Sequence, residues 1–191
     1  MSSLVIPASL TNLVAEIGKT PLDDRVLSAM AKVPRHEFAP IEVQPYAYLN
    51  RPLPIGFDRT ISQPLMVAVM TDLLELKPDD AVLEIGTGLG YQAAVLAELA
   101  GRVYTVEIID ELAQRAVQRL KRQGYINVEV CVGNGYFGWP EHAPFDKVMH
   151  GGARSDPTFF DQPAQGWRKD GDSGRPARGP ATCRGREGFA R

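Results

Sequence analysis

The pattern of apolar residues changes along the chain from a helical period to short continuous runs. Near the N-terminus, apolar side chains at positions 10, 13, 14 and 17 predict a helix that Gly18 ends. The Thr-Pro-Leu-Asp sequence at 20–23 predicts the start of a second helix, with Thr20 as its cap and Pro21 in its first turn. A third helix is predicted directly after Pro64, on the apolar residues Met66, Val67, Met70, Leu73 and Leu74.

From about residue 81 onwards, apolar runs alternate with stretches of helical spacing. Four such runs predict buried strands, at residues 82–85, 102–109, 128–132 and 145–149. Because strands that alternate with helices form parallel sheets, the pattern predicts a doubly wound α/β fold. Ligands of such sheets bind at the carboxyl ends of the strands.

A long stretch at 40–64 precedes this region and has few regular periods. It holds five prolines and two tyrosines, and we interpret it as a structured loop of the kind that is often functional. Ser62 stands just before the proline-led helix, and spacing alone favours a helix N-cap for it. No histidine is near in sequence to make this serine the nucleophile of a hydrolase.

Three glycines at alternate positions, Gly86, Gly88 and Gly90, follow the first predicted strand. Glycine lets a backbone approach a ligand closely, and the following helix start offers free N–H groups. Tyr91 occupies the place of the third glycine of a dinucleotide-binding turn, and no Gly-Lys-Ser/Thr follows for a phosphate loop. The pattern Glu84-x-Gly-x-Gly-x-Gly is typical of methyltransferases that use S-adenosyl-L-methionine (SAM). The alternative is a merely tight strand-to-helix turn.

The next predicted strand carries an acid, Glu107, near its carboxyl end. Its separation from the glycines is close to the roughly 20 residues at which an acid meets ribose hydroxyls in such folds. The alternative role is a solvated acid at a strand end. We expect Glu107, the Gly86 turn and Asn134 to converge at one edge of the sheet.

Composition and charge restrict the classes of partner. The 191 residues are 44% hydrophobic and 23% charged, as expected for one globular domain with a sizeable core. The net charge of −2 gives no reason to expect nucleic acid or an anionic membrane surface. No apolar run is long enough to span a bilayer, and the N-terminus lacks a basic-then-apolar signal. We therefore expect a cytoplasmic protein that binds neither nucleic acid nor membrane.

The composition changes at residue 150. From there to Arg191 the chain contains no valine, leucine, isoleucine or methionine, and arginine, glycine and proline dominate. Such a segment buries too little apolar area to offset its ordering entropy, so we expect residues 150–191 to be a disordered tail without buried strands. A basic tail that binds nucleic acid is a weaker alternative, because eight Lys/Arg against five Asp/Glu give it a small charge.

Over about residues 10–149 the chain resembles the protein-L-isoaspartate O-methyltransferase family. The most specific signal is Thr-Ile-Ser-Gln-Pro at 60–64, since many methyltransferases share the glycine turn. Further matching segments are 33–35, 51–56, 82–88, 104–107, 133–135, 138–139 and 143–146. The resemblance implies a Rossmann-like domain that transfers a methyl group from SAM to the free α-carboxylate of L-isoaspartyl residues, a repair of damaged proteins. Residues 1–80 would supply the substrate side and residues 81–149 the SAM-binding core.

The resemblance also implies site residues. Ser62 corresponds to the active-site serine and would orient the acceptor carboxylate. The positions that would contact SAM are Thr60, Ile61, Gly86, Thr87, Gly88, Gly90, Glu107, Asn134 and Gly135. No metal is expected, because a carboxylate is already ionised at neutral pH. The family has aspartate at position 134, and since an amide oxygen can still accept a hydrogen bond, Asn134 predicts weaker cofactor binding and not its loss.

The resemblance implies three further strands after Asp146, and the residues of the tail match none of them. Their bias is typical of a GC-rich gene read out of frame, and the expected sheet ends with its fourth strand. The expected partners are isoaspartyl peptides or proteins, bound by a monomer. Two alternatives remain open: an inactive SAM-binding remnant or regulatory module, and a methyltransferase acting on small molecules or nucleic acid.

Overall fold

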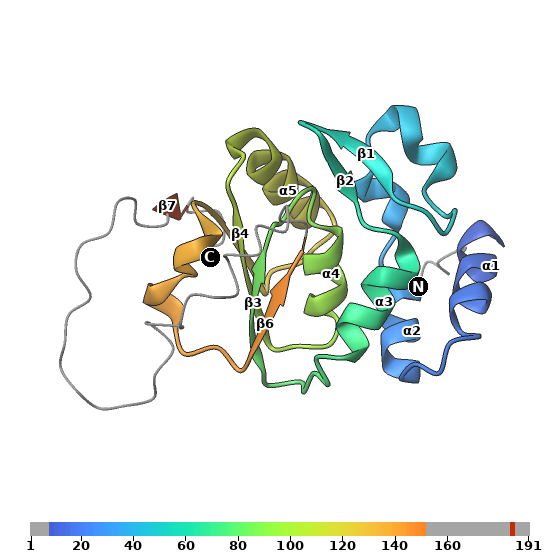
Figure 1. The fold of residues 1–191 in the computed structure, drawn as a ribbon, viewed down its shortest axis with the longest axis horizontal. Helices are drawn as coiled ribbons and strands as arrows, with labels where there is room; N and C mark the ends of the chain where they lie inside the picture. The colour runs from blue at the N-terminus through green and yellow to red at the C-terminus, as the bar shows by residue number, and fades with distance from the viewer. Residues whose placement is uncertain (1–7, 152–183, 186–191) are drawn as a thin grey trace.

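The computed structural model describes residues 8–151 and 184–185 and places a group of helices and a hairpin beside a five-stranded sheet (Figure 1). The order of the strands across the sheet is β6-β3-β4-β5-β7. Their bounds are β3 (Ala81–Ile85), β4 (Arg102–Glu107), β5 (Val128–Val132), β6 (Lys147–His150) and β7 (Arg184–Gly185).

Strands β6, β3, β4 and β5 are parallel, which confirms the predicted α/β class. Helices α4 (Tyr91–Ala97) and α5 (Asp110–Arg122) contribute to the larger apolar core together with one face of the sheet. On the other face, a smaller buried cluster includes Leu83, Tyr104 and Trp139 and lies beside the short 3-10 turns at 135–137 and 140–142. Figure 1 shows these turns on the opposite side of the sheet from α4. Both faces are covered, and most side chains of β3, β4 and β5 are buried.

The expectation that the sheet ends with its fourth strand is wrong in one respect. The two residues of β7 pair antiparallel with β5, with Cys131 opposite Gly185 and Val132 opposite Arg184. An edge strand offers backbone N–H and C=O groups that can pair with any extended segment, so a pairing this short needs no apolar run. The expected disorder concerns residues 150–191, which lie outside the described residues except for 150, 151, 184 and 185.

The N-terminal helices are α1 (Ala8–Ile17), α2 (Asp24–Lys32) and α3 (Pro64–Asp72). Helix α2 begins later than predicted, and its cap is Asp23, not Thr20. The Asp23 carboxylate accepts a hydrogen bond of 2.8 Å from the backbone N–H of Arg25, which satisfies a free donor of the first turn. An acid three residues nearer to the helix therefore takes the capping role that threonine was expected to fill.

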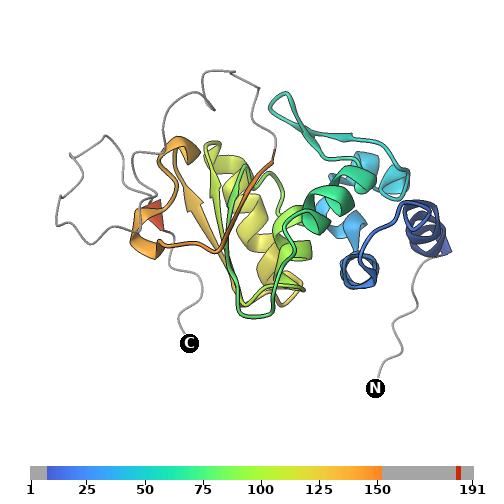
Figure 2. The same cartoon turned by 60° about the horizontal axis from the view of Figure 1, so that its bottom comes forward.

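The stretch at 40–64 is more regular than predicted. The 3-10 helix η1 (Arg35–Phe38) precedes it, and it contains η2 (Ile41–Tyr46) and a hairpin of β1 (Leu53–Gly56) and β2 (Arg59–Ile61). Figure 2 shows the hairpin as an arm that extends from the helical group. The inward positions Leu53, Ile55 and Ile61 are buried, whereas Pro54 is exposed. Proline is tolerated in this two-stranded ribbon, and its presence concealed the alternating pattern.

Candidate active site

One cavity brings together the hairpin side and the glycine turn, which are far apart in the sequence. Six of the predicted site residues line it: Thr60, Ile61, Ser62, Gly86, Thr87 and Gly88. The other lining residues are Ile55, Val67, Met70, Glu84, Leu89, Tyr91, Gln92 and Gly151. The cavity thus lies at the carboxyl end of β3, where a parallel sheet places its ligands.

The glycine turn needs glycine for two separate reasons. Gly86, Gly88 and Gly90 have φ angles of 95°, 55° and 90°, in the left-handed region that a side chain disfavours. A Cβ added to Gly86 would also lie 1.8 Å from the carbonyl oxygen of Gly151. The N–H of Gly151 in turn donates a 2.7 Å hydrogen bond to the Ile85 carbonyl, so β6 closes one side of the turn.

Glu107 holds this turn in place. One carboxylate oxygen accepts a 2.8 Å hydrogen bond from the N–H of Gly88, and the other accepts a 3.0 Å hydrogen bond from the N–H of Ile109. Only 5% of Glu107 is exposed, so the alternative of a solvated acid is wrong. Glu107 does not line the cavity itself. Because a carboxylate offers about four acceptor sites, it retains capacity for a ligand beyond these two bonds.

Glu84 lines the cavity, although the sequence analysis named it only as part of the glycine pattern and not as a site residue. It is completely buried, and its Oε2 accepts a 2.5 Å hydrogen bond from the Thr105 hydroxyl, which also contacts the Thr87 hydroxyl at 2.7 Å. Burial raises the pKa of Glu84 to about 8, and the Thr105 hydrogen bond acts in the opposite direction. Its Oε1 makes no hydrogen bond to any of the described residues. An acid inside an apolar strand was the signal that could have identified it.

Ser62 does not cap α3. The N-cap is Gln63, whose side chain makes no capping bond, because Pro64 takes the first helical position and thereby leaves Ser62 one residue too early. The Ser62 carbonyl accepts a 2.7 Å hydrogen bond from Arg35 Nη2. Its hydroxyl makes no hydrogen bond within the described part of the chain and is therefore available to a ligand.

The remaining predicted contacts lie outside the cavity. Gly90 forms the N-cap of α4 and packs against Leu120, since a Cβ there would lie 3.2 Å from the leucine. The Asn134 side chain accepts a 3.0 Å hydrogen bond from the N–H of Tyr136. A Cβ on Gly135 would lie 2.3 Å from the Ile85 side chain, so the turn that follows β5 reaches the end of β3, as expected. The adenine contact of Asn134 stays a prediction.

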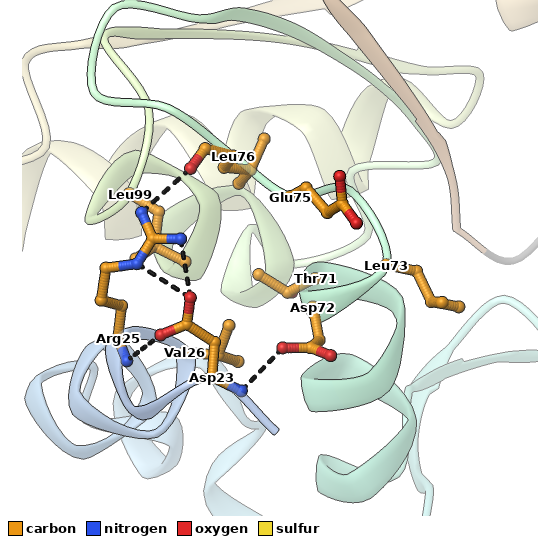
Figure 3. A pocket seen from close by; sticks show the side chains of 9 residues that line it. All are labelled: Asp23, Arg25, Val26, Thr71, Asp72, Leu73, Glu75, Leu76 and Leu99. Atoms are coloured by element: carbon orange, nitrogen blue, oxygen red, sulfur yellow. Dashed lines mark hydrogen bonds and ion pairs between the residues drawn. The ribbon is translucent and has the colours of Figure 1, made fainter. Parts of the chain in front are cut away.

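A larger cavity of about 270 Å³ lies elsewhere, against about 50 Å³ for the one described above. It lies between α2 and α3 and contains none of the predicted site residues (Figure 3). Its polar groups largely satisfy one another. Arg25 pairs with the Asp23 carboxylate and donates to the Leu76 carbonyl, and Asp72 accepts from the N–H of Asp23. This cavity is therefore a poorer candidate for chemistry than the smaller one.

The fold and the glycine turn held by Glu107 define an α/β protein of the SAM-dependent methyltransferase type. The chain belongs to the Protein-L-isoaspartate(D-aspartate) O-methyltransferase (PCMT) family, whose sequence pattern matches residues 9–168. That match continues past residue 149, where the resemblance was expected to end. Among the relatives, a protein-L-isoaspartate O-methyltransferase 1 of Polaromonas sp. is 64% identical over 144 residues, which are 75% of this chain. A protein-L-isoaspartate O-methyltransferase 2 of Nitrosococcus oceani is 63% identical over 133 residues, or 70% of this chain.

Solved structures agree with the fold. A protein-L-isoaspartate O-methyltransferase has a TM-score of 0.66 and 30% identity, over 73% of this chain and 47% of that one. A putative enzyme of this family from Plasmodium falciparum, solved with S-adenosyl-L-homocysteine, has a TM-score of 0.67 over 77% of this chain and 75% of that one. At 23% identity the second likeness concerns the fold. The chain spans 61% of the length of each of the two relatives named above.

Proposed function

We propose that this chain transfers a methyl group from SAM to the free α-carboxylate of L-isoaspartyl residues in damaged proteins. The observation that carries the proposal is the position of Ser62. Its hydroxyl, which makes no hydrogen bond within the described residues, lines the same cavity as the glycine turn. A group that can donate to a carboxylate thus stands beside a loop suited to a nucleotide-like cofactor.

The residues present are compatible with SAM. The turn at Gly86 and Gly88 allows close approach of backbone to ligand, and Glu107 retains acceptor sites for the ribose hydroxyls. Glu84 Oε1 is a buried polar atom that makes no hydrogen bond within the described residues, and a polar group of a ligand in the cavity could satisfy it. When bound, SAM would supply a methyl group activated by a positively charged sulfur.

The side chains of this cavity suit a reaction that needs orientation more than proton transfer. An α-carboxylate is ionised at neutral pH, so its oxygen can attack a methyl carbon without a base. Ser62 would donate a hydrogen bond to the second oxygen and fix the direction of attack. The neighbouring Ile55, Ile61 and Val67 are buried and keep the cavity apolar, which excludes competing water.

A direct test compares two peptides that differ only in one residue, L-isoaspartate or normal aspartate. The full chain should form a base-labile methyl ester on the first and not on the second. Ser62→Ala should lower turnover while SAM affinity stays within about twofold. Ser28→Ala, an exposed serine of α2, is the matched control and should change neither quantity. SAM binding without any transfer in the unmodified chain would overturn the proposal in favour of a SAM-binding module.

The proposed partners are isoaspartyl peptides or proteins, and we propose that the chain acts as a monomer in the cytoplasm without binding nucleic acid. The near-neutral net charge of −2 supports the last point. The helices of residues 8–151 are too short or too polar to cross a membrane. Light scattering coupled to size exclusion would test the monomer, and a gel-shift titration with RNA and DNA would test the absence of nucleic-acid binding.

A further inference from the structure

Arg35 is a buried cation without an acidic partner. It is 0% exposed, and none of the ion pairs among the described residues includes it. Burial lowers the pKa of its guanidinium, and the nearby Tyr91 acts in the opposite direction. Arginine is almost never fully buried unless it is paired, because desolvation of the charge is costly. The contacts that Arg35 does make therefore call for a functional explanation.

Those contacts join three separate segments around the cavity. Nε donates a 2.8 Å hydrogen bond to the Ala47 carbonyl, and Nη2 donates a 2.7 Å hydrogen bond to the Ser62 carbonyl. The guanidinium carbon lies 4.7 Å from the centroid of the Tyr91 ring. Tyr91 is the first residue of α4, directly after the glycine turn, and Phe38 packs edge-on against the same ring at 5.9 Å. Arg35 thus connects the hairpin side of the cavity to the cofactor side.

We propose that Arg35 is a positioning residue for methyl transfer, which holds the Ser62 backbone at a fixed place relative to the glycine turn. The inference rests on the proposed function. Ser62 is in no regular element, since β2 ends at Ile61 and α3 begins at Pro64. Asn50 Oδ1 accepts a 3.0 Å hydrogen bond from the N–H of Leu65 and so restrains the first turn of α3, whereas the charged hydrogen bond from Arg35 acts on Ser62 itself.

Lysine at position 35 would keep the charge but lose the arrangement. A guanidinium donates through several nitrogens in a fixed plane while it stacks on an aromatic ring, whereas an ammonium is a single point donor. Arg35→Lys should therefore leave the net charge unchanged and free the Ser62 carbonyl. This variant separates positioning from a simple electrostatic attraction of the acceptor, which lysine would preserve.

Kinetics of the full chain with an isoaspartyl peptide provide the first test. We expect Arg35→Lys to lower kcat/KM for the peptide about tenfold or more, while the affinity for S-adenosyl-L-homocysteine stays within about twofold. In a Ser62→Ala background the same substitution should have an effect of no more than about twofold, because its action passes through Ser62. Equal losses in both backgrounds, or an equal loss of cofactor affinity, would overturn the inference.

Arg25→Lys is the matched control. Arg25 also donates to a backbone carbonyl, that of Leu76 at 3.1 Å, but it has Asp23 as an acidic partner and lies at the other cavity (Figure 3). We expect it to leave peptide kinetics unchanged. A melting curve for each variant, with correction to the folded fraction, separates positioning from general instability.

If the unmodified chain transfers no methyl group, the proposed function is wrong, but the inference about Arg35 can still be tested. Hydrogen exchange provides that test. Arg35→Lys should accelerate exchange of two hydrogen-bonded amides next to Ser62 about tenfold relative to the amides of α5. These are the amide of Leu65, which donates to Asn50 Oδ1, and that of Val67, which donates to the Gln63 carbonyl. Unchanged exchange at these two amides would show that Arg35 does not restrain the junction, and the inference would be wrong.

Discussion

The Glu107 carboxylate and the backbone N–H of Gly88 lie 2.8 Å apart, so an acid at the end of β4 fixes the glycine turn that follows β3. The sequence suggested that Glu107 serves the ligand, which stays a prediction, and the structure shows that it serves the protein. The N–H of Gly133 donates a 2.9 Å hydrogen bond to the backbone carbonyl of Glu107, which holds the end of β5 beside the end of β4. Glu107 therefore lies at the centre of three strand ends.

The expected contact of Glu107 with the ribose of SAM gives a first prediction. Glu107→Ala should weaken SAM binding by about 1.5–3 kcal/mol, the size of a hydrogen bond to a charged group. Titration calorimetry measures this directly. Glu111→Ala, an exposed acid in the first turn of α5, serves as the control and should leave affinity unchanged. An unaltered affinity in folded Glu107→Ala would show that this acid serves the glycine turn only.

A second prediction concerns Gly86. Gly86→Ala combines an unfavourable φ of 95° with a methyl group placed 1.8 Å from the Gly151 carbonyl. The left-handed conformation alone costs an L-residue about 1–2 kcal/mol, and the clash must add to it. Gly124→Ala isolates the first contribution, because its φ is 82° and nothing lies within 4 Å of the added Cβ.

Urea unfolding of the two variants measures the difference. We expect the free energy of unfolding to fall clearly further in Gly86→Ala than in Gly124→Ala. Equal losses of unfolding free energy would mean that the chain after β6 moves away from the added methyl group at no cost. Gly151 would then not fix the conformation of the turn.

The third prediction follows from the raised pKa of Glu84, which is about 8 where the ordinary value is 4.5. A carboxyl group whose pKa is raised on folding binds its proton more tightly in the native state. Its contribution to stability is therefore complete below pH 4.5 and is lost as the pH rises toward about 8. Over this window the free energy of unfolding should fall by at most about 1.4 kcal/mol per pH unit from this group.

Glu84→Gln removes the titration while keeping an acceptor for the Thr105 hydroxyl. Chemical denaturation across this pH range should give a flatter slope for Glu84→Gln than for the unmodified chain. Glu111→Gln, exposed on α5, should keep the original slope. If all three slopes coincide, Glu84 is ionised in the native state throughout the range.

The strands were the most predictable part of the chain. The run at 128–132 became β5 with the same bounds, because four of its five residues are apolar and both faces of the sheet are covered there. The hairpin at 53–61 was missed, since Pro52 and Pro54 concealed an alternation that needs only Leu53, Ile55 and Ile61 to face inward. The pattern of apolar residues predicts a buried strand well where the apolar residues follow one another, and poorly where prolines interrupt them.

The site was predictable where it is local in sequence. The glycine turn and the Ser62 segment line one cavity, as the resemblance implied. The roles of Arg35 and Glu84 were not predicted, because the partners that define them, Ser62 and Thr105, lie 27 and 21 residues away. Spacing along the chain cannot report such partners, which only the folded arrangement brings together.

Gly151 has a consequence for engineering. Its carbonyl touches Gly86 and its backbone lines the cavity, and it is also among the first residues after the change in composition. The last residue that lines the cavity therefore lies at the point where a chimaera with another C-terminal segment would be joined. Exchanging residues 152–191 for the corresponding segment of the Polaromonas relative would leave every contact reported for Gly86, Glu107 and Ser62 in place. The SAM affinity and methyl transfer of such a hybrid would show how much a C-terminal region contributes to the cavity described above.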